Sequence, residues 1–178
     1  MGTIFIAGIY GVGKSTLCDN LSKMLGIPAY SAGDLISSVN GEHYGANKAV
    51  TDKISNQAIL ALQVQELLKV TPQILLAGHF CIFDKDNNID YLPENVFSDL
   101  EIEKMLLLNA PIAIILKNLS LRDKKEYTQQ QVLSLYNAEN KRAKEISHKL
   151  GCELFIHNMR FDTTDILKCL SYIKEDNV

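Results

Sequence analysis

The chain has 178 residues, 47% of them hydrophobic and 22% charged, which is enough apolar material for one sizeable core and too little chain for two ordinary domains. The formal net charge is −3, and the 18 Lys and Arg and 21 Asp and Glu residues are dispersed along the chain. This composition argues against a protein whose main task is to coat nucleic acid.

Cysteine spacing and the N-terminal sequence indicate the compartment. The four cysteines form no C-x-x-C pair, which argues against a zinc or redox motif and predicts free buried thiols. The apolar run near the N-terminus is too short to span a bilayer and lacks a basic export region. We therefore expect a cytoplasmic protein with no membrane partner.

The first predicted elements alternate between strand and helix. Residues 3–7 are apolar at nearly every position, which predicts a strand covered on both faces. An apolar stripe at helical spacing predicts a helix over 14–26. A short strand over 28–31 is followed by a brief helix over 34–39, with Asp34 as its expected cap.

The middle of the chain continues the alternation. We predict a surface loop over 40–47, a long helix over 51–70 and a buried strand over 73–78. The polar turn between the apolar segments 81–83 and 89–92 predicts a small hairpin beyond the sheet edge.

The C-terminal part adds two strands and at least two helices. Residues 104–108 predict a strand. A helix that carries the apolar residues of 112–119 is predicted to follow Pro111, although 112–116 could equally be a strand by periodicity alone. A long helix over 129–150, a strand over 153–156 and a capping pattern at 162–165 complete the chain. The alternation predicts an α/β three-layer sandwich with a five-stranded parallel sheet.

One glycine-rich segment carries a specific signal. Residues 8–16, GIYGVGKST, match G-x-x-x-x-G-K-[ST] between a predicted buried strand and an amphipathic helix, as a P-loop requires. Its glycines allow successive N–H groups to point at an anion, and the helix adds the positive end of its dipole. The residues predicted to bind nucleotide are Gly8, Gly11, Val12, Gly13, Lys14, Ser15 and Thr16.

The last three of these residues have distinct expected roles. Lys14 is expected to reach the β- and γ-phosphates, the Ser15 hydroxyl to ligate Mg²⁺, and Thr16 to lie near the α-phosphate. The expected ligands are therefore ATP and magnesium. The motif alone leaves the reaction open, but the chain has no guanine-reading N-K-x-D segment and no insertion typical of ring ATPases, which favours small-molecule kinases.

Several short segments, taken in chain order together with this motif, resemble those of a known family. With 8–16, the segments 30–34, 78–79, 91–93 and 122–123 make the chain similar to the adenylate kinase group of nucleoside monophosphate kinases, most closely its small archaeal-type branch and similar short bacterial proteins. The resemblance implies transfer of the γ-phosphoryl of ATP to a nucleoside monophosphate, AMP before others. It also implies one P-loop kinase-type domain over 1–178, with an acceptor-binding segment at about 31–70 and a short lid at about 118–128.

Phosphoryl transfer relies on cations and N–H groups more than on a nucleophilic side chain. Lys14 is the fixed cation, and the resemblance makes Arg122 the mobile one that arrives as the lid closes; a solvated charged turn is the alternative. Arg142 is a candidate second catalytic cation, although a charged exposed helix face explains it nearly as well.

The resemblance also assigns the acceptor side to Ser31, Gly33, Asp34 and His79. Asp34 as a plain helix cap and His79 as a structural histidine are the alternatives. The chain departs from the family at Ala32 and Ser37, where Thr and Arg are usual, and at Ala77, where a carboxylate usually organises Mg²⁺ through water.

These departures keep two other functions open. One is an ATP- or ADP-binding regulatory module with weak ATPase activity. The other is a polynucleotide 5′-hydroxyl kinase, with a groove lined by Lys48, Lys53, Lys124 and Lys125, although the acidic charge balance counts against it.

Overall fold

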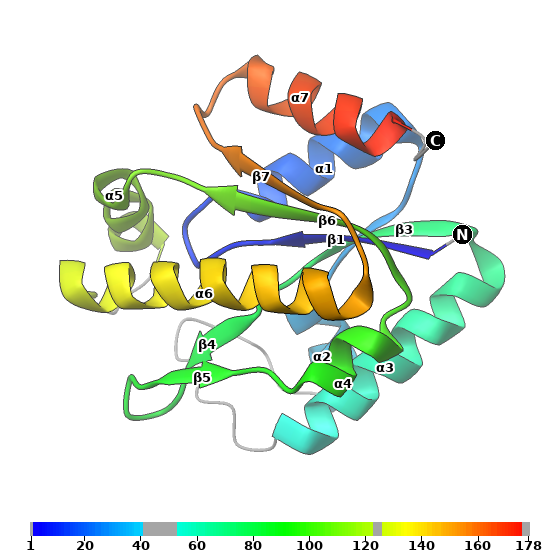
Figure 1. The fold of residues 1–178 in the computed structure, drawn as a ribbon, viewed down its shortest axis with the longest axis horizontal. Coiled ribbons are helices and arrows are strands. Elements are labelled where there is room, and N and C mark those ends of the chain that lie inside the picture. The colour runs from blue at the N-terminus through cyan, green and yellow to red at the C-terminus, as the bar shows by residue number, and fades with distance from the viewer. Residues whose placement is uncertain (1, 41–52, 123–125, 176–178) are drawn as a thin grey trace.

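A parallel sheet of five strands forms the centre of the molecule (Figure 1). The computed structural model describes residues 2–40, 53–122 and 126–175. The strands lie in the order β2-β3-β1-β6-β7, and every neighbouring pair is parallel. Their bounds are β1 Gly2–Ala7, β2 Ala29–Ser31, β3 Gln73–Ala77, β6 Ile102–Asn109 and β7 Leu154–Asn158. The predicted fold class is confirmed.

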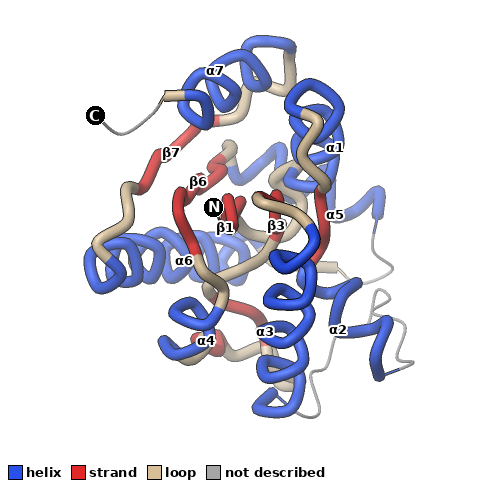
Figure 2. Tube along the Cα trace, turned by 90° about the vertical axis from the view of Figure 1, so that its right-hand side faces the viewer, coloured by secondary structure: helices blue, strands red, loops and turns tan. Residues whose placement is uncertain are grey.

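Helices cover both faces of this sheet, which makes three layers (Figures 1 and 2). Helices α1 and α7 lie together on one face, and α3, α4 and α6 lie on the other. Helix α2 packs against α3, and α5 lies beyond the carboxyl ends of the strands, beside α6. The bounds are α1 Lys14–Leu25, α2 Ala32–Asn40, α3 Lys53–Val70, α4 Glu94–Asp99, α5 Ile112–Arg122, α6 Gln129–Leu150 and α7 Thr163–Lys174.

The strands are apolar on both sides because both faces are covered. Every residue of β1 is buried, and Ile74, Leu75 and Leu76 of β3 are completely inaccessible. Under α6, the rings of Phe5, Phe80 and Phe97 meet with centroids 5.0 to 5.8 Å apart. Such aromatic contacts bury large areas and fix how α4 sits on the sheet.

Local signals end the helices where the sequence predicts. Gly26 and Gly151 adopt left-handed conformations after α1 and α6, as glycine does most readily. Helix α7 begins with a capping box of Asp162 and Asp165, so the shorter Asp can replace the usual Glu. Thr128 and Gln131 form a second capping box before α6, which the sequence analysis did not identify.

Three predictions about elements need correction or completion. Asp34 is not a cap: α2 already begins at Ala32, and the Ser31 hydroxyl accepts the Asp34 N–H at 3.4 Å. Residues 112–119, ambiguous by pattern, are helical in α5. Helix α4 was not predicted. Of the predicted loop 40–47, only Asn40, the last residue of α2, is described.

The predicted hairpin is confirmed as the antiparallel strands β4, Cys81–Phe83, and β5, Ile89–Tyr91. Its turn is held by the Asp84 carboxylate, which accepts the N–H groups of Asp86 and Asn88 at 2.8 Å each. The four cysteines are free, as predicted, but Cys152 is only partly buried. Within the described residues, no helix has the length and hydrophobicity to cross a bilayer.

Candidate functional site

The segment 8–16 connects β1 to α1 and wraps as a P-loop does. Gly8, Gly11 and Gly13 have φ values of 145°, 79° and 98°, all on the side that favours glycine. A Cβ atom on Gly8 would lie 2.6 Å from the Leu108 carbonyl oxygen, so a side chain there would collide with the backbone of β6. The glycines are therefore required by the path of the loop.

Lys14 folds back over this loop. Its Nζ donates to the carbonyl oxygens of Gly8 at 2.6 Å and Ile9 at 3.1 Å. The ammonium is thus held over the loop by carbonyl groups of the loop's own backbone. A cation fixed over a glycine loop is suited to bind a polyphosphate.

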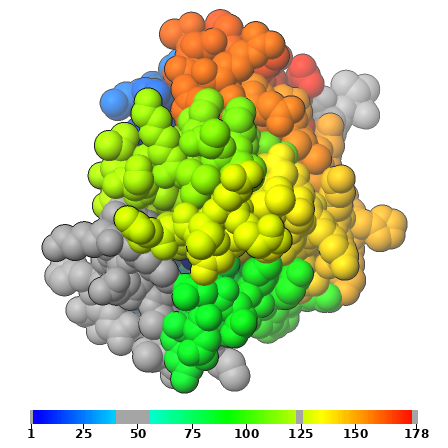
Figure 3. Space-filling view, turned by 90° about the vertical axis from the view of Figure 1, so that its left-hand side faces the viewer, coloured from blue at the N-terminus to red at the C-terminus, as the bar shows by residue number. Residues whose placement is uncertain are grey.

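A cavity of about 840 Å³ opens at the carboxyl ends of the strands, next to the P-loop. Ligand crevices of parallel sheets usually lie at this edge. Figure 3 views the molecule from this side, where α5 and the start of α6 lie between the orange β7–α7 region and the green hairpin. Because β1 is central in the sheet, the P-loop lies between two walls of the cavity.

The first wall, here called the α5 wall, consists of Asn118 and Arg122 of α5 and six residues around the start of α7, which are Met159, Phe161, Asp162, Thr163, Asp165 and Ile166. Asn118 anchors α5 to the P-loop, since its Nδ2 donates to the Gly11 carbonyl oxygen at 2.8 Å. Phe161 approaches the P-loop from the other side, with its ring atom Cε1 3.4 Å from where a Cβ on Gly13 would lie. This wall carries the P-loop's only described cationic neighbour in the cavity lining, Arg122.

The second wall, here called the α3 wall, comes from α2, α3, α4, β1, β2, β3 and the hairpin with the segments that adjoin them. It is mainly apolar, with amides of Asn56 and Gln57, the Ser31 hydroxyl and the His79 ring as its polar groups. His79 also packs against the Tyr10 ring, with centroids 4.5 Å apart. The apolar side chains are those of Phe5, Ile36, Leu60, Ile82, Leu92, Val96, Phe97 and Leu100.

The cavity brings together most of the predicted site residues. Those in its lining are Gly11, Gly13, Lys14, Ser15, Thr16, Ser31, Gly33, His79 and Arg122. Gly8, Val12, Asp34 and Arg142 are not in the lining. Val12 is completely buried and Asp34 is exposed, whereas the N–H of Gly8 is bound from behind by Glu139.

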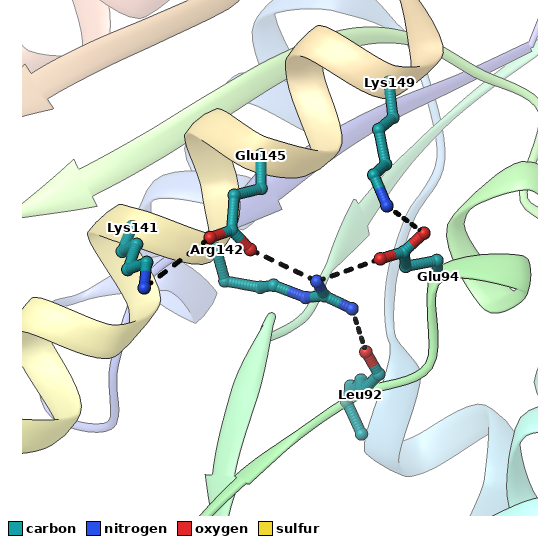
Figure 4. A network of polar contacts seen from close by, with 6 residues as sticks. All are labelled: Leu92, Glu94, Lys141, Arg142, Glu145 and Lys149. Atoms are coloured by element: carbon teal, nitrogen blue, oxygen red, sulfur yellow. Dashed lines mark hydrogen bonds and ion pairs between the residues drawn. The ribbon is translucent and has the colours of Figure 1, made fainter.

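Arg142 takes part in a different network, drawn in Figure 4. Its guanidinium donates to Glu94 at 3.4 Å, to Glu145 at 3.2 Å and to the Leu92 carbonyl oxygen at 3.0 Å, and its side chain is 12% exposed. Lys149 also pairs with Glu94. The prediction that Arg142 faces the phosphates is not supported by this placement, since these contacts bind α6 to α4 instead.

Two buried carboxylates beside the cavity, Glu139 and Asp165, were not predicted as site residues from the sequence. Glu139 of α6 accepts backbone N–H groups from Gly8, Phe80 and Cys81, and burial raises its pKa to about 7. A sequence signal existed, because Glu139 falls on the same helical stripe as the buried Leu135 and Ala143. A charged residue on the buried apolar face of a helix needs hydrogen-bond or ion-pair partners, because burial of an unpaired charge is unfavourable.

The second missed carboxylate is Asp165, which is 2% exposed. It accepts the N–H groups of Arg160, Phe161 and Asp162 and a hydrogen bond with His157 Nε2 at 2.7 Å. Burial favours a higher pKa, but these hydrogen bonds outweigh it and hold the pKa of Asp165 below its usual 3.8. Asp165 thereby shapes the loop in front of α7 as an ionised group.

The described residues fit a magnesium ion only if phosphates and water supply most of its ligands. No group of three or more His, Cys, Asp or Glu side chains suited to a metal occurs among residues 2–40, 53–122 and 126–175. The exposed Ser15 hydroxyl lines the cavity next to Lys14. Mg²⁺ commonly takes one or two protein oxygens and completes its shell with phosphates and water, which this donor set allows.

Comparisons with known proteins agree with this geometry. The sequence profile of the AAA domain family matches residues 7–135. No curated protein matches the chain. The shikimate kinase from Bacteroides thetaiotaomicron is similar in structure, with a TM-score of 0.62 and 13% identity over 97% of this chain and 96% of that chain.

Two further solved structures are similar over comparable lengths. The shikimate kinase from Acinetobacter baumannii, in complex with shikimate, has a TM-score of 0.61 and 13% identity, covering 97% of this chain and 90% of that chain. A gluconokinase from Sinorhizobium meliloti 1021 has a TM-score of 0.58 and 12% identity, covering 97% and 93%. At such identities the likeness shows the fold alone, which is that of small P-loop kinases.

Proposed function

The chain belongs to the AAA domain family, and from this premise we propose that it transfers the γ-phosphoryl group of Mg-ATP to a nucleoside monophosphate, AMP before others. One observation carries the proposal: the P-loop lies between two walls of one cavity that differ in chemistry. We assign the α5 wall to ATP and the α3 wall to the acceptor. The whole chain acts as one domain in this proposal, with residues 118–128 as its lid.

The apolar character of the α3 wall supports a nucleotide acceptor. Shikimate and gluconate, after which the structural neighbours are named, are polyhydroxylated carboxylates, which need hydrogen-bonding groups around their whole surface. The described part of the α3 wall offers eight apolar side chains against two amides, a hydroxyl and an imidazole. A flat nucleobase buries apolar faces and presents polar edges, which suits such a wall.

The residues of the cavity would divide the work as follows. Lys14 neutralises charge on the transferring phosphoryl group, and the loop N–H groups orient it. Arg122, on the α5 wall, adds a second positive charge when the lid closes and excludes water. The Ser15 hydroxyl would hold Mg²⁺ together with the phosphates, and the bound ion would supply charge neutralisation.

Ala77 favours a second candidate function. It lies at the end of β3, is 8% exposed and lines the cavity where a carboxylate could have organised the metal's water. Weak turnover would suit a regulatory module that binds ATP or ADP. The polynucleotide kinase alternative rests on a basic groove, but Lys48, Lys124 and Lys125 lie outside the described residues, as does the side chain of Lys53.

A screen with γ-labelled ATP tests the proposal. The purified chain is incubated with Mg²⁺, labelled ATP and, separately, each nucleoside monophosphate, shikimate, gluconate and an oligonucleotide with a 5′ hydroxyl. We expect label in ADP formed from AMP, and little free phosphate. Label appearing only as free phosphate would support the regulatory module and contradict the kinase proposal.

The matched variants are Lys14→Ala and Lys23→Ala, which remove cations from opposite ends of α1. Loss of Lys14 should abolish transfer, because it removes the cation held over the P-loop. Lys23 is exposed in the last turn of α1, so its loss should leave transfer unchanged. Equal activity of both variants would place the chemistry elsewhere.

A further inference from the structure

Glu139 is the most completely buried charged side chain near the P-loop, with 0% exposure. Its Oε1 accepts the Gly8 N–H at 3.2 Å and the Phe80 N–H at 3.0 Å, and its Oε2 accepts the N–H groups of Phe80 at 2.9 Å and Cys81 at 2.7 Å. One carboxylate of α6 therefore binds two backbone segments that are more than 70 residues apart in sequence.

One of these segments is the P-loop, which lies between the two walls of the cavity, and the other continues from the α3 wall. Gly8 is the first residue of the P-loop, directly after β1. Phe80 and Cys81 directly follow His79 on the α3 wall. The backbone ladder between β1 and β3 ends with the Gly78 N–H, which donates to the Ile6 carbonyl oxygen at 3.0 Å. Beyond that point, Glu139 joins the two segments by hydrogen bonds, and the Tyr10 ring of the P-loop also packs against His79.

An apolar residue could fill the same volume at lower cost, because burying a carboxylate is unfavourable. It could not accept three backbone N–H groups that diverge from the ends of two strands. Burial of the Glu139 carboxylate is therefore unfavourable by itself, but its hydrogen bonds fix the distance between the P-loop and the segment after His79.

We propose that Glu139 is a positioning residue, which sets the P-loop against the His79 segment so that donor and acceptor phosphates meet in line. The proposal rests on the proposed function for the identity of the two walls. Glu139 contacts no substrate in this scheme. It acts through the Gly8 N–H on one side and the Phe80 and Cys81 N–H groups on the other.

Glu139→Gln is the sharpest variant, because a carboxamide has one accepting oxygen. That oxygen can keep either the Gly8 side or the Cys81 side, but not both. The Gly8 bond is the longest of the set, so we expect the amide oxygen to stay with Phe80 and Cys81 and the Gly8 N–H to lose its acceptor. Glu145→Gln is the control, since it makes the same change on the same helix within the Arg142 network.

The experiment measures kcat, the KM for ATP and AMP, the affinity for ADP by calorimetry and the melting temperature, all at pH 8. We expect Glu139→Gln to lower kcat at least about tenfold while the affinity for ADP changes by less than about threefold. Misaligned reactants lose rate more than binding. A kcat equal to that of Glu145→Gln, with or without a lower melting temperature, would overturn the proposal.

Hydrogen exchange of the Gly8 amide gives a readout that needs no turnover. We expect slow exchange in the wild type and in Glu145→Gln, and faster exchange in Glu139→Gln. Equally slow exchange of the Gly8 amide in all three proteins would contradict the proposal that Glu139 holds the P-loop. If Glu139→Gln does not fold, Glu139→Asp keeps the charge on a side chain one methylene shorter and should show the same loss of kcat; an unchanged kcat there would overturn the proposal.

The two proposals fail in different ways. Wild-type protein that transfers no phosphate to any monophosphate would contradict the proposed function. The exchange of the Gly8 amide in Glu139→Gln would still decide whether the carboxylate holds the P-loop.

Discussion

Two buried carboxylates hold backbone N–H groups at the edges of this cavity, in addition to Lys14, which holds backbone carbonyls of the P-loop. Glu139 and Asp165 each accept three backbone N–H groups, and each joins a helix to a loop that lines or supports the cavity. Their protonation differs, because burial raises the pKa of Glu139, whereas hydrogen bonding lowers that of Asp165. The pH therefore affects the site through these two carboxylates, which hold its backbone.

Glu139 predicts a pH-dependent stability. Its pKa is raised from 4.5 to about 7 on folding, mainly by desolvation, so the folded protein holds this proton more tightly than the unfolded chain. The stability from this group is fully present below pH 4.5 and is lost as pH rises through about 7.

Urea unfolding of wild type and Glu139→Gln at several pH values measures this effect. The free energy of unfolding of the wild type, relative to the variant, should fall between pH 4.5 and pH 8. A difference that stays constant, or rises with pH, would contradict the assigned direction of the shift.

Ala77→Asp tests the metal's surroundings. Ala77 lines the cavity, so a carboxylate there should hold a metal-bound water, tighten Mg²⁺ and raise transfer about tenfold, or roughly 1.4 kcal/mol of the barrier. The magnesium dependence of turnover and the melting temperature are measured together. A lower melting temperature with unchanged Mg²⁺ dependence would mean that the new carboxylate is buried without a partner.

Among the elements, the loop before α7 is the part of the α5 wall with the most constrained backbone. Phe161 has a φ of 62°, which is unfavourable for a residue with a side chain, and its N–H is held by Asp165. The same carboxylate binds His157 of β7, so strand, loop and helix share one anchor.

Asp165→Asn should loosen this loop. The carboxamide has one accepting oxygen for four partner groups, so Phe161 would leave its place beside Gly13. We expect the Kd for ATP to rise about fivefold with a smaller change in kcat, measured by calorimetry and steady-state kinetics. Asp99→Asn, an exposed change at the end of α4, serves as control. Unchanged affinity would show that the loop does not bind ATP.

For Arg122, at the end of α5, we predict the opposite pattern, a larger effect on kcat than on ATP binding. Under the proposed function, Arg122→Ala should lower kcat more than it raises the KM for ATP, because the charge would act mainly in the transition state. Lys117→Ala, on the same helix, is the matched control for loss of an exposed cation. An increased KM with an intact kcat would reassign Arg122 to ground-state binding.

At the scale of the whole molecule, local patterns predict the layers well and the tertiary contacts poorly. The strands around Ile4, Ile74 and Leu106 read directly as apolar runs, because both faces of a central parallel strand are covered. The P-loop was predictable for a similar reason, since glycine, lysine and hydroxyl positions are local requirements.

Residues whose role depends on a distant segment were not predictable in this way. From the sequence, Arg142 is a cation on an exposed helix face. Only the fold brings Glu94, which is 48 residues away in sequence, into contact with it. Glu139 meets Gly8 only after 131 residues of chain have folded. Asp34 resembled a cap because the sequence does not show that the helix starts two residues earlier, behind Ser31.

The central claim is that one cavity holds donor and acceptor nucleotides on opposite sides of the P-loop. A bisubstrate compound, two adenosines joined through five phosphates, spans both walls and tests this claim most directly by calorimetry against ATP and AMP alone. We predict one molecule bound per chain, at least about a hundredfold more tightly than ATP, because joining the two ligands removes the entropy cost of binding the second. Binding no tighter than that of ATP would contradict the two-sided site.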